Sequence, residues 1–219
     1  SCRSHSVSIM HKRAIKLRNY FLQDINPVVR FLILSDTIFS GATGLLGPIF
    51  ALFIADFIQG GNEAVAGMAA GIYMFTRGLL QIPFAHIMDR IRGERDDFWF
   101  MFVFSALIGV LPLLYLVIDT PLELYLIQAI MGLCTAFTYP SFMAIMTRHV
   151  DKKKEGTEWG VYFTLVDFAG AIFAALGGYV AATEGFPMLI MTVVIINVLG
   201  AFMLWFVKPY IRFPRKRAA

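Results

Sequence analysis

Long apolar runs alternate with short polar breaks along most of this 219-residue chain. A helix needs about 20 mainly apolar residues to cross the hydrocarbon core of a bilayer. Six runs approach or exceed that length, at residues 29–57, 64–88, 98–118, 122–147, 159–182 and 187–207. The breaks between them are too short to hold a soluble domain. The pattern therefore predicts an all-α, polytopic membrane protein with six transmembrane helices, in which successive helices are antiparallel.

Basic residues occupy alternate connections between these runs. Eighteen of the nineteen Lys and Arg residues lie near the start of the first run or after the second, fourth and last runs, whereas Arg77 lies inside the second. Short cytoplasmic loops retain Lys and Arg, and short translocated loops lack them. We therefore expect both termini in the cytoplasm and a plasma or inner membrane location. The expected division is a basic segment at 1–28, a transmembrane domain at 29–207 and a basic tail at 208–219.

Composition agrees with a membrane protein and excludes several other classes. Apolar residues make up 58% of the chain and charged residues 16%, compared with about 45–50% apolar residues in soluble domains. The net charge of +4 lies beside the runs, where anionic lipid explains it, so we expect lipid contact and no nucleic-acid partner. Cys2 and Cys134 form no metal-ligand spacing. No enzyme motif such as His-Glu-x-x-His is present, so we expect no catalytic residue, no metal, no cofactor and no enzymatic activity.

Two ionisable residues lie near the middle of predicted spans and carry opposite charges. An ionised side chain at the centre of a membrane helix costs about 2.5–3.5 kcal/mol on insertion scales, so it usually faces a partner or a wet cavity. Arg77 and Asp167 lie at similar depth, which favours an ion pair either within one chain or between two. In the alternative interpretation, Arg77 faces water or the backbone carbonyls near Pro83, and Asp167 is neutral.

Asp36 is the third intramembrane ionisable residue, about two turns into the first predicted span. Ser35 and Thr37 flank it. As a cavity-facing carboxylate, Asp36 could bind and release a proton or contact a substrate. As a structural residue, it could pair with Arg30 or with a neighbouring hydroxyl group.

Proline placement and a short internal match indicate a repeated, interrupted bundle. Pro lies inside four of the six runs, and kinks at these positions favour a cavity, although membrane helices also tolerate Pro generally. The segment at 47–51 resembles that at 139–143, at an offset of 92 residues. This match predicts two inverted three-helix repeats. Gln128 stands at the same offset from Asp36, which makes it a reasonable cavity position.

Small residues predict where helices approach one another closely. Gly67 and Gly71 form a Gly-x-x-x-Gly pair in the second run, and Gly132 with Ala136 repeats that spacing in the fourth. The fifth run is rich in Gly and Ala between residues 170 and 178. We therefore expect the second and fifth runs to supply packing faces.

The connection after the second run resembles a known signature. The stretch from Ala85 to Arg95 is similar to the cytoplasmic motif G-x-L-A-D-R-x-G-R-R of the major facilitator superfamily, and the resemblance covers about residues 27–208. The Asp and first Arg of the motif match, Ala85 replaces the leading Gly, and the later Gly and Arg come one residue late. The resemblance gives these residues an interface or gating role, and they are Asp89, Arg90, Arg92, Gly93 and Arg95.

The resemblance also implies an architecture and a function. Members of the superfamily normally have twelve spans in two similarly oriented halves, and this chain resembles the amino-terminal half. In the superfamily, spans one and four of each half line the cavity, and spans two and five contact the other half. The resemblance therefore makes Asp36 in span one, and Gln128, Thr138 and Tyr139 in span four, the candidates for a substrate or proton site. The resemblance thus implies a half-size secondary transporter that moves a small organic solute by alternating access as a dimer. Coupling of this transport to proton movement is a further possibility that the resemblance leaves open.

The partner half has more than one possible source. It could be a second copy in a parallel homodimer or a separate carboxy-terminal half, and in the alternative hypothesis the chain is a non-transporting fragment or an assembly partner. In a homodimer, Arg77 would meet Asp167 of the other copy twice, by symmetry. Asp89 would then lie near Gly156 and Thr157 of that copy, at a helix amino terminus that favours an acidic group.

Overall fold

The computed structural model describes residues 25–90 and 93–211, and these residues form helices and no strand. Arg92 and residues 1–24 and 212–219 of the predicted basic end segments lie outside the described residues. The fold is therefore all-α over the described part of the chain, as predicted. In chain order, the elements are α2 (Pro27–Leu46), η1 (Gly47–Ile49), α3 (Phe50–Phe57), α4 (Glu63–Arg90), α5 (Glu94–Val110), η2 (Leu111–Leu116), α6 (Pro121–His149), α7 (Glu155–Leu204) and η3 (Trp205–Tyr210).

Local sequence signals explain where helices begin. Asn26 caps α2 by accepting a hydrogen bond from the backbone N–H of Val28. Thr120 and Glu123 form a reciprocal capping box at the start of α6, with Pro121 at the first helical position. Such caps satisfy backbone donors that a helix leaves unpaired at its amino terminus.

The four prolines inside the apolar runs have two different effects. Pro48 lies in the η1 turn that separates α2 from α3, and Pro112 lies in η2 after the end of α5. Pro83 and Pro140 instead lie inside the continuous helices α4 and α6. The repeat-related prolines, Pro48 and Pro140, therefore have different local structures, because one ends a helix and the other is accommodated within one.

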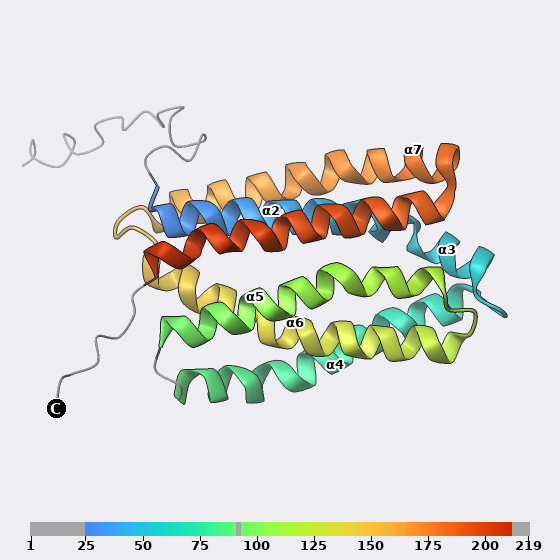
Figure 1. Ribbon diagram of the computed structural model, residues 1–219, viewed down its shortest axis with the longest axis horizontal. Helices are drawn as coiled ribbons and strands as arrows, with labels where there is room; N and C mark the ends of the chain where they lie inside the picture. The colour runs from blue at the N-terminus through green and yellow to red at the C-terminus, as the bar shows by residue number, and fades with distance from the viewer. Residues whose placement is uncertain (1–24, 91–92, 212–219) are drawn as a thin grey trace, which may run out of the picture.

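Helix α7 consists of two arms that run in opposite directions (Figure 1). Its only non-helical backbone lies at Gly185, with φ 82° and ψ 171°, a conformation that Gly adopts more readily than other residues. The predicted run at 159–182 falls in the first arm, and the run at 187–207 covers the second arm and the start of η3. Five helical segments of the described residues are long and apolar enough to cross a membrane, with both arms counted in the fifth: 27–57, 63–90, 94–116, 121–149 and 155–210.

The helices form two groups that α5 connects. Helix α2 packs mainly on both arms of α7, helix α4 packs on α6, and α5 contacts both α6 and α7 (Figure 1). The antiparallel order of the helices brings all the described basic connections to the end of the bundle where α2 begins, which we call the basic end. This arrangement matches the alternation of basic connections along the sequence.

Close helix contacts occur where small residues predicted them in α6 and α7. A Cβ atom at Gly132 would lie 2.6 Å from the carbonyl oxygen of Tyr73 in α4, and one at Gly44 would lie 2.8 Å from that of Gly170. Gly177 is packed against the backbone of Leu45 in α2. The Gly-x-x-x-Gly pair of α4 differs, because no atom lies within 4 Å of a Cβ built at either glycine. That face of α4 is open within this chain.

Replacing Gly177 by Ala is expected to destabilise the protein because the added methyl group would overlap the backbone of Leu45. Overpacking of this kind costs about 1–3 kcal/mol, which exceeds the gain of about 1 kcal/mol in helix propensity. Gly178→Ala is the matched control, since nothing lies within 4 Å of its added Cβ. Thermal unfolding in detergent should show a lower midpoint only for Gly177→Ala. Equal midpoints for the two variants would contradict this packing.

Candidate functional site

A polar cavity of about 290 Å³ lies between the two helix groups. Its wall includes residues of α2, α4, α5 and α6 and the second arm of α7. Three of the residues predicted as substrate or proton contacts, Asp36, Thr138 and Tyr139, line it together. The remaining lining residues are Ser35, Phe39, Ser40, Thr43, Tyr73, Arg77, Met101, Ser105, Ile108, Thr135, Phe142 and Leu204.

Asp36 is the acidic group of this cavity. Its Oδ2 atom accepts a hydrogen bond of 2.8 Å from the hydroxyl of Tyr162, in the first arm of α7. The neighbouring Ser35 donates from Oγ to the carbonyl oxygen of Gly200, in the second arm, at 2.8 Å. The partner of Asp36 is thus Tyr162 rather than Arg30. These two bonds fix the rotation of α2 between the arms, so the carboxylate lines the cavity.

Arg77 supplies the positive charge of the same cavity. Its guanidinium carbon lies 4.9 Å from the centroid of the Tyr139 ring, and its Nε donates to Oε1 of Gln81 at 3.4 Å. A cation over an aromatic face is stabilised by the ring quadrupole. The ion pairs of the described residues include none between Arg77 and Asp167. Asp167 is instead exposed on the first arm of α7, so pairing within one chain is not observed.

The polar side chains of α6 differ in the contacts they make and in the cavity they line. Thr138 donates its hydroxyl to the carbonyl oxygen of Cys134 at 3.0 Å, within its own helix. Tyr139 presents its ring to Arg77. Gln128, the fourth predicted contact, does not line the polar cavity but an adjoining one.

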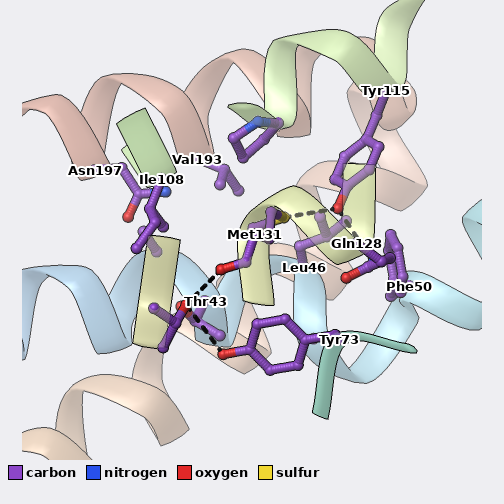
Figure 2. A pocket seen from close by; sticks show the side chains of 14 residues that line it. Thr43, Leu46, Phe50, Tyr73, Ile108, Tyr115, Gln128, Met131, Val193 and Asn197 are labelled. Atoms are coloured by element: carbon purple, nitrogen blue, oxygen red, sulfur yellow. Dashed lines mark hydrogen bonds between the residues drawn. The ribbon is translucent and has the colours of Figure 1, made fainter. Parts of the chain in front are cut away.

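This second cavity has a volume of about 260 Å³ and is mostly apolar (Figure 2). Gln128 donates to the hydroxyl of Tyr115 at 3.3 Å, and that hydroxyl lies 3.2 Å from the sulfur of Met131. Asn197 lies at the opposite end (Figure 2). The two cavities share four lining residues, Thr43, Tyr73, Ile108 and Thr135. Sequence reasoning did not identify this cavity, because its apolar residues look like ordinary membrane-helix residues.

Charged residues form a network at the basic end. Arg148, at the end of α6, donates to Oδ2 of the buried Asp97 in the first turn of α5. Nε2 of His149 lies 3.8 Å from Oε2 of Glu94. Breaking a buried pair by removing one partner is costly because a charge is left uncompensated. The network therefore joins α5 to α6 beneath the cavity. The acidic residues in the first turn of α5 were the sequence signal for it.

The residues of the signature lie around this network. Asp89, Arg90 and Arg95 are exposed, and Gly93 is the extended residue that precedes α5. Arg92 lies outside the described residues. The exposed charges are available to a partner. Nothing in the described part of the chain forms a group of three or more His, Cys, Asp or Glu residues able to hold a metal ion.

Long apolar helices that enclose two cavities are the architecture of a polytopic membrane protein. The family model described as Major Facilitator Superfamily matches residues 32–219, and the chain belongs to that superfamily.

The similar proteins found by sequence comparison are bacterial. The chain is 23% identical over 186 residues to a protein of Klebsiella pneumoniae (strain 342), and 24% identical over 195 residues to one of Rahnella sp. (strain Y9602). Both are named multidrug resistance protein MdtG, and each match covers 84% of this chain and 44% of the relative. The chain thus spans less than half the length of these relatives. No solved structure matches it significantly.

Proposed function

We propose that this chain is one half of a secondary transporter that moves a small organic solute by alternating access. The observation that carries this proposal is the polar cavity between the helix groups, with Asp36 in its wall. Substrate and coupling-ion sites of secondary transporters lie near the middle of the membrane, at the interface of repeated units. Asp36, Thr138 and Tyr139 would contact the solute in the first cavity, and Gln128 would do so in the second.

The proposed second half is another copy of the chain. Asp167 is exposed on an otherwise apolar face of α7, where contact with lipid would be costly for a carboxylate. A parallel second copy that places α4 against this face would offer Arg77 to Asp167, twice by symmetry. In the same arrangement, Asp89 would meet the start of the partner's α7. A separate half of the same family is the alternative partner.

The proposed orientation and coupling follow from charge. The basic end would face the cytoplasm, because short cytoplasmic loops retain Lys and Arg, in a plasma or inner membrane. Asp36 would bind a proton when its cavity opens to one side and release it when the cavity opens to the other. The relatives are named for multidrug resistance, which supports organic solutes of more than one structure as the substrate class.

Two measurements test this proposal. The mass of the purified protein in nanodiscs, after subtraction of lipid, should be twice 24.6 kDa. Expression of the chain in bacteria that lack their own efflux pumps should raise tolerance to several compounds in a panel of small organic toxins. A monomer with no co-purifying partner, together with unchanged tolerance across the panel, would favour a non-transporting assembly partner instead.

A further inference from the structure

The apolar cavity has no role in the proton step proposed above. No acidic or basic side chain lines it. Its walls come from α2, η1, α3, α4, α5, η2, α6 and the second arm of α7. It joins the Asp36 cavity along Thr43 and Tyr73. A ligand in the Asp36 cavity could therefore extend into it without crossing a helix.

Asn197 is the unusual residue of this cavity. Asn197 is only 5% exposed. Its Oδ1 atom is buried without a hydrogen-bond partner, and its Nδ2 atom donates to no described residue. Burial of an amide without a partner is unfavourable. The backbone of α7 is held close to α5 at this point, because a Cβ atom at Gly109 would lie 3.3 Å from that of Asn197. The amide is therefore fixed at the cavity wall with its hydrogen-bonding capacity unused.

The polar groups at the opposite end of the cavity are already engaged. Gln128 and Tyr115 are joined by a hydrogen bond, and the Tyr115 hydroxyl contacts Met131. Thr135 donates to the carbonyl oxygen of Met131 at 2.8 Å. A ligand would thus meet a mostly apolar and aromatic surface with two amides, of which Gln128 is already bonded to Tyr115 and Asn197 makes no hydrogen bond to a described residue (Figure 2).

We propose that this cavity is a subsite for an uncharged aromatic group that bears one oxygen acceptor, such as a ketone or an ether, hydrogen-bonded by the Asn197 amide. The subsite deepens the proposed transport function by defining one part of the substrate. Most of the ligand's contact would be apolar, with the single polar group fixing its orientation. The Asp36 cavity would receive whatever polar or charged part the same molecule carries.

Benzophenone is a suitable probe because it has two aromatic rings and one carbonyl oxygen. Under near-ultraviolet light, that oxygen abstracts hydrogen from a nearby C–H bond, and the two resulting carbon radicals combine. Met131 lines the cavity, whereas Met74 and Met191 are 68% and 45% exposed on the outer surface. Irradiation of the protein in nanodiscs followed by peptide mass spectrometry should show preferential labelling of Met131. The exposed methionines report labelling by probe dissolved in lipid.

Three variants identify why benzophenone labels Met131 in preference to the exposed methionines. Asn197→Leu preserves the side chain's size and should reduce Met131 labelling about two- to tenfold, the range expected for one lost neutral hydrogen bond. Val193→Phe should fill the cavity and remove the preference for Met131. Thr192→Val is the control, because the Thr192 hydroxyl bonds to the carbonyl oxygen of Met188 in its own helix. It should label like the unmodified protein.

The thermal stability of the Asn197→Leu variant shows whether Asn197 serves a ligand or the packing of the helices. Because the Asn197 amide has no partner, Asn197→Leu should leave the midpoint of thermal unfolding unchanged or raise it. Labelling of Met131 no stronger than that of Met74, or labelling unaffected by Asn197→Leu, would overturn the subsite. So would a lower unfolding midpoint for that variant. Labelling requires no transport, so the subsite and the proposed transport function can fail independently of each other.

Discussion

Asp36→Asn is expected to abolish the tolerance conferred by the chain and any proton movement that accompanies solute flux. Asn has nearly the same size and still accepts a hydrogen bond from Tyr162, so the helix packing should survive. It cannot bind and release a proton. Loss of the interaction between the Asp36 carboxylate and the solute costs about 1.5–3 kcal/mol. The solute should therefore bind roughly ten- to hundredfold more weakly.

Two further variants distinguish coupling from packing. Asp56→Asn changes an exposed carboxylate of α3 and should retain full activity. Tyr162→Phe removes the hydroxyl that bonds Asp36 but leaves the carboxylate, so it should reduce activity less than Asp36→Asn does. Solute uptake into weakly buffered proteoliposomes that contain a pH-sensitive dye measures both solute flux and proton movement. An Asp36→Asn protein that still couples solute to proton movement would assign Asp36 a structural role.

Charge reversal at Arg77 is expected to dissociate the proposed dimer. Arg77→Glu would place two acidic side chains opposite each other at each Arg77–Asp167 contact, and juxtaposed like charges cost several kcal/mol. The dissociation constant should rise by about a hundredfold or more. Asp167→Arg alone should have the same effect, whereas the double variant restores the pair with its charges exchanged. Mass measurement in detergent at graded protein concentrations compares the dimer's dissociation constant for all three variants.

The rescue is the decisive part of that experiment, because Arg77 also contacts Tyr139 and Gln81. A single reversal could therefore disturb the cavity without any interface being involved. Glu184→Arg, at an exposed site near the turn between the arms of α7, is the control and should remain dimeric. If the double variant stays monomeric, the Arg77–Asp167 contact between copies is excluded.

The course of the helices could be predicted from sequence, but their inward faces could not. Apolar runs and alternating basic connections are direct consequences of bilayer thickness and insertion, and the structure follows them. Membrane helices carry little facial contrast, however, because lipid is as apolar as the core. Leu32 is fully buried and Ile82 is 78% exposed, although nothing in their residue types separates them. The different effects of Pro48 and Pro140 were equally hidden.

The candidate site could be predicted only in part, because the sequence does not show which face of a membrane helix points inward. Polar residues within apolar runs are conspicuous, so Asp36, Thr138 and Tyr139 could be found and do share a cavity. The position of Arg77 in that cavity was not predicted, because depth along a helix does not specify the direction of a side chain. Asn197 was visible in the sequence, but whether it had a partner depended on the packing of α5 against α7.

The order of synthesis gives the contact between Asp36 and Tyr162 a further consequence. These residues are 126 positions apart, and a ribosome adds about 5–20 residues per second. The carboxylate therefore spends roughly 6–25 seconds of translation before its partner exists. Helix α2 as a whole is also made long before its main packing partners, which are the two arms of α7. Helix α2 therefore has to remain without these packing partners until both arms of α7 have been made.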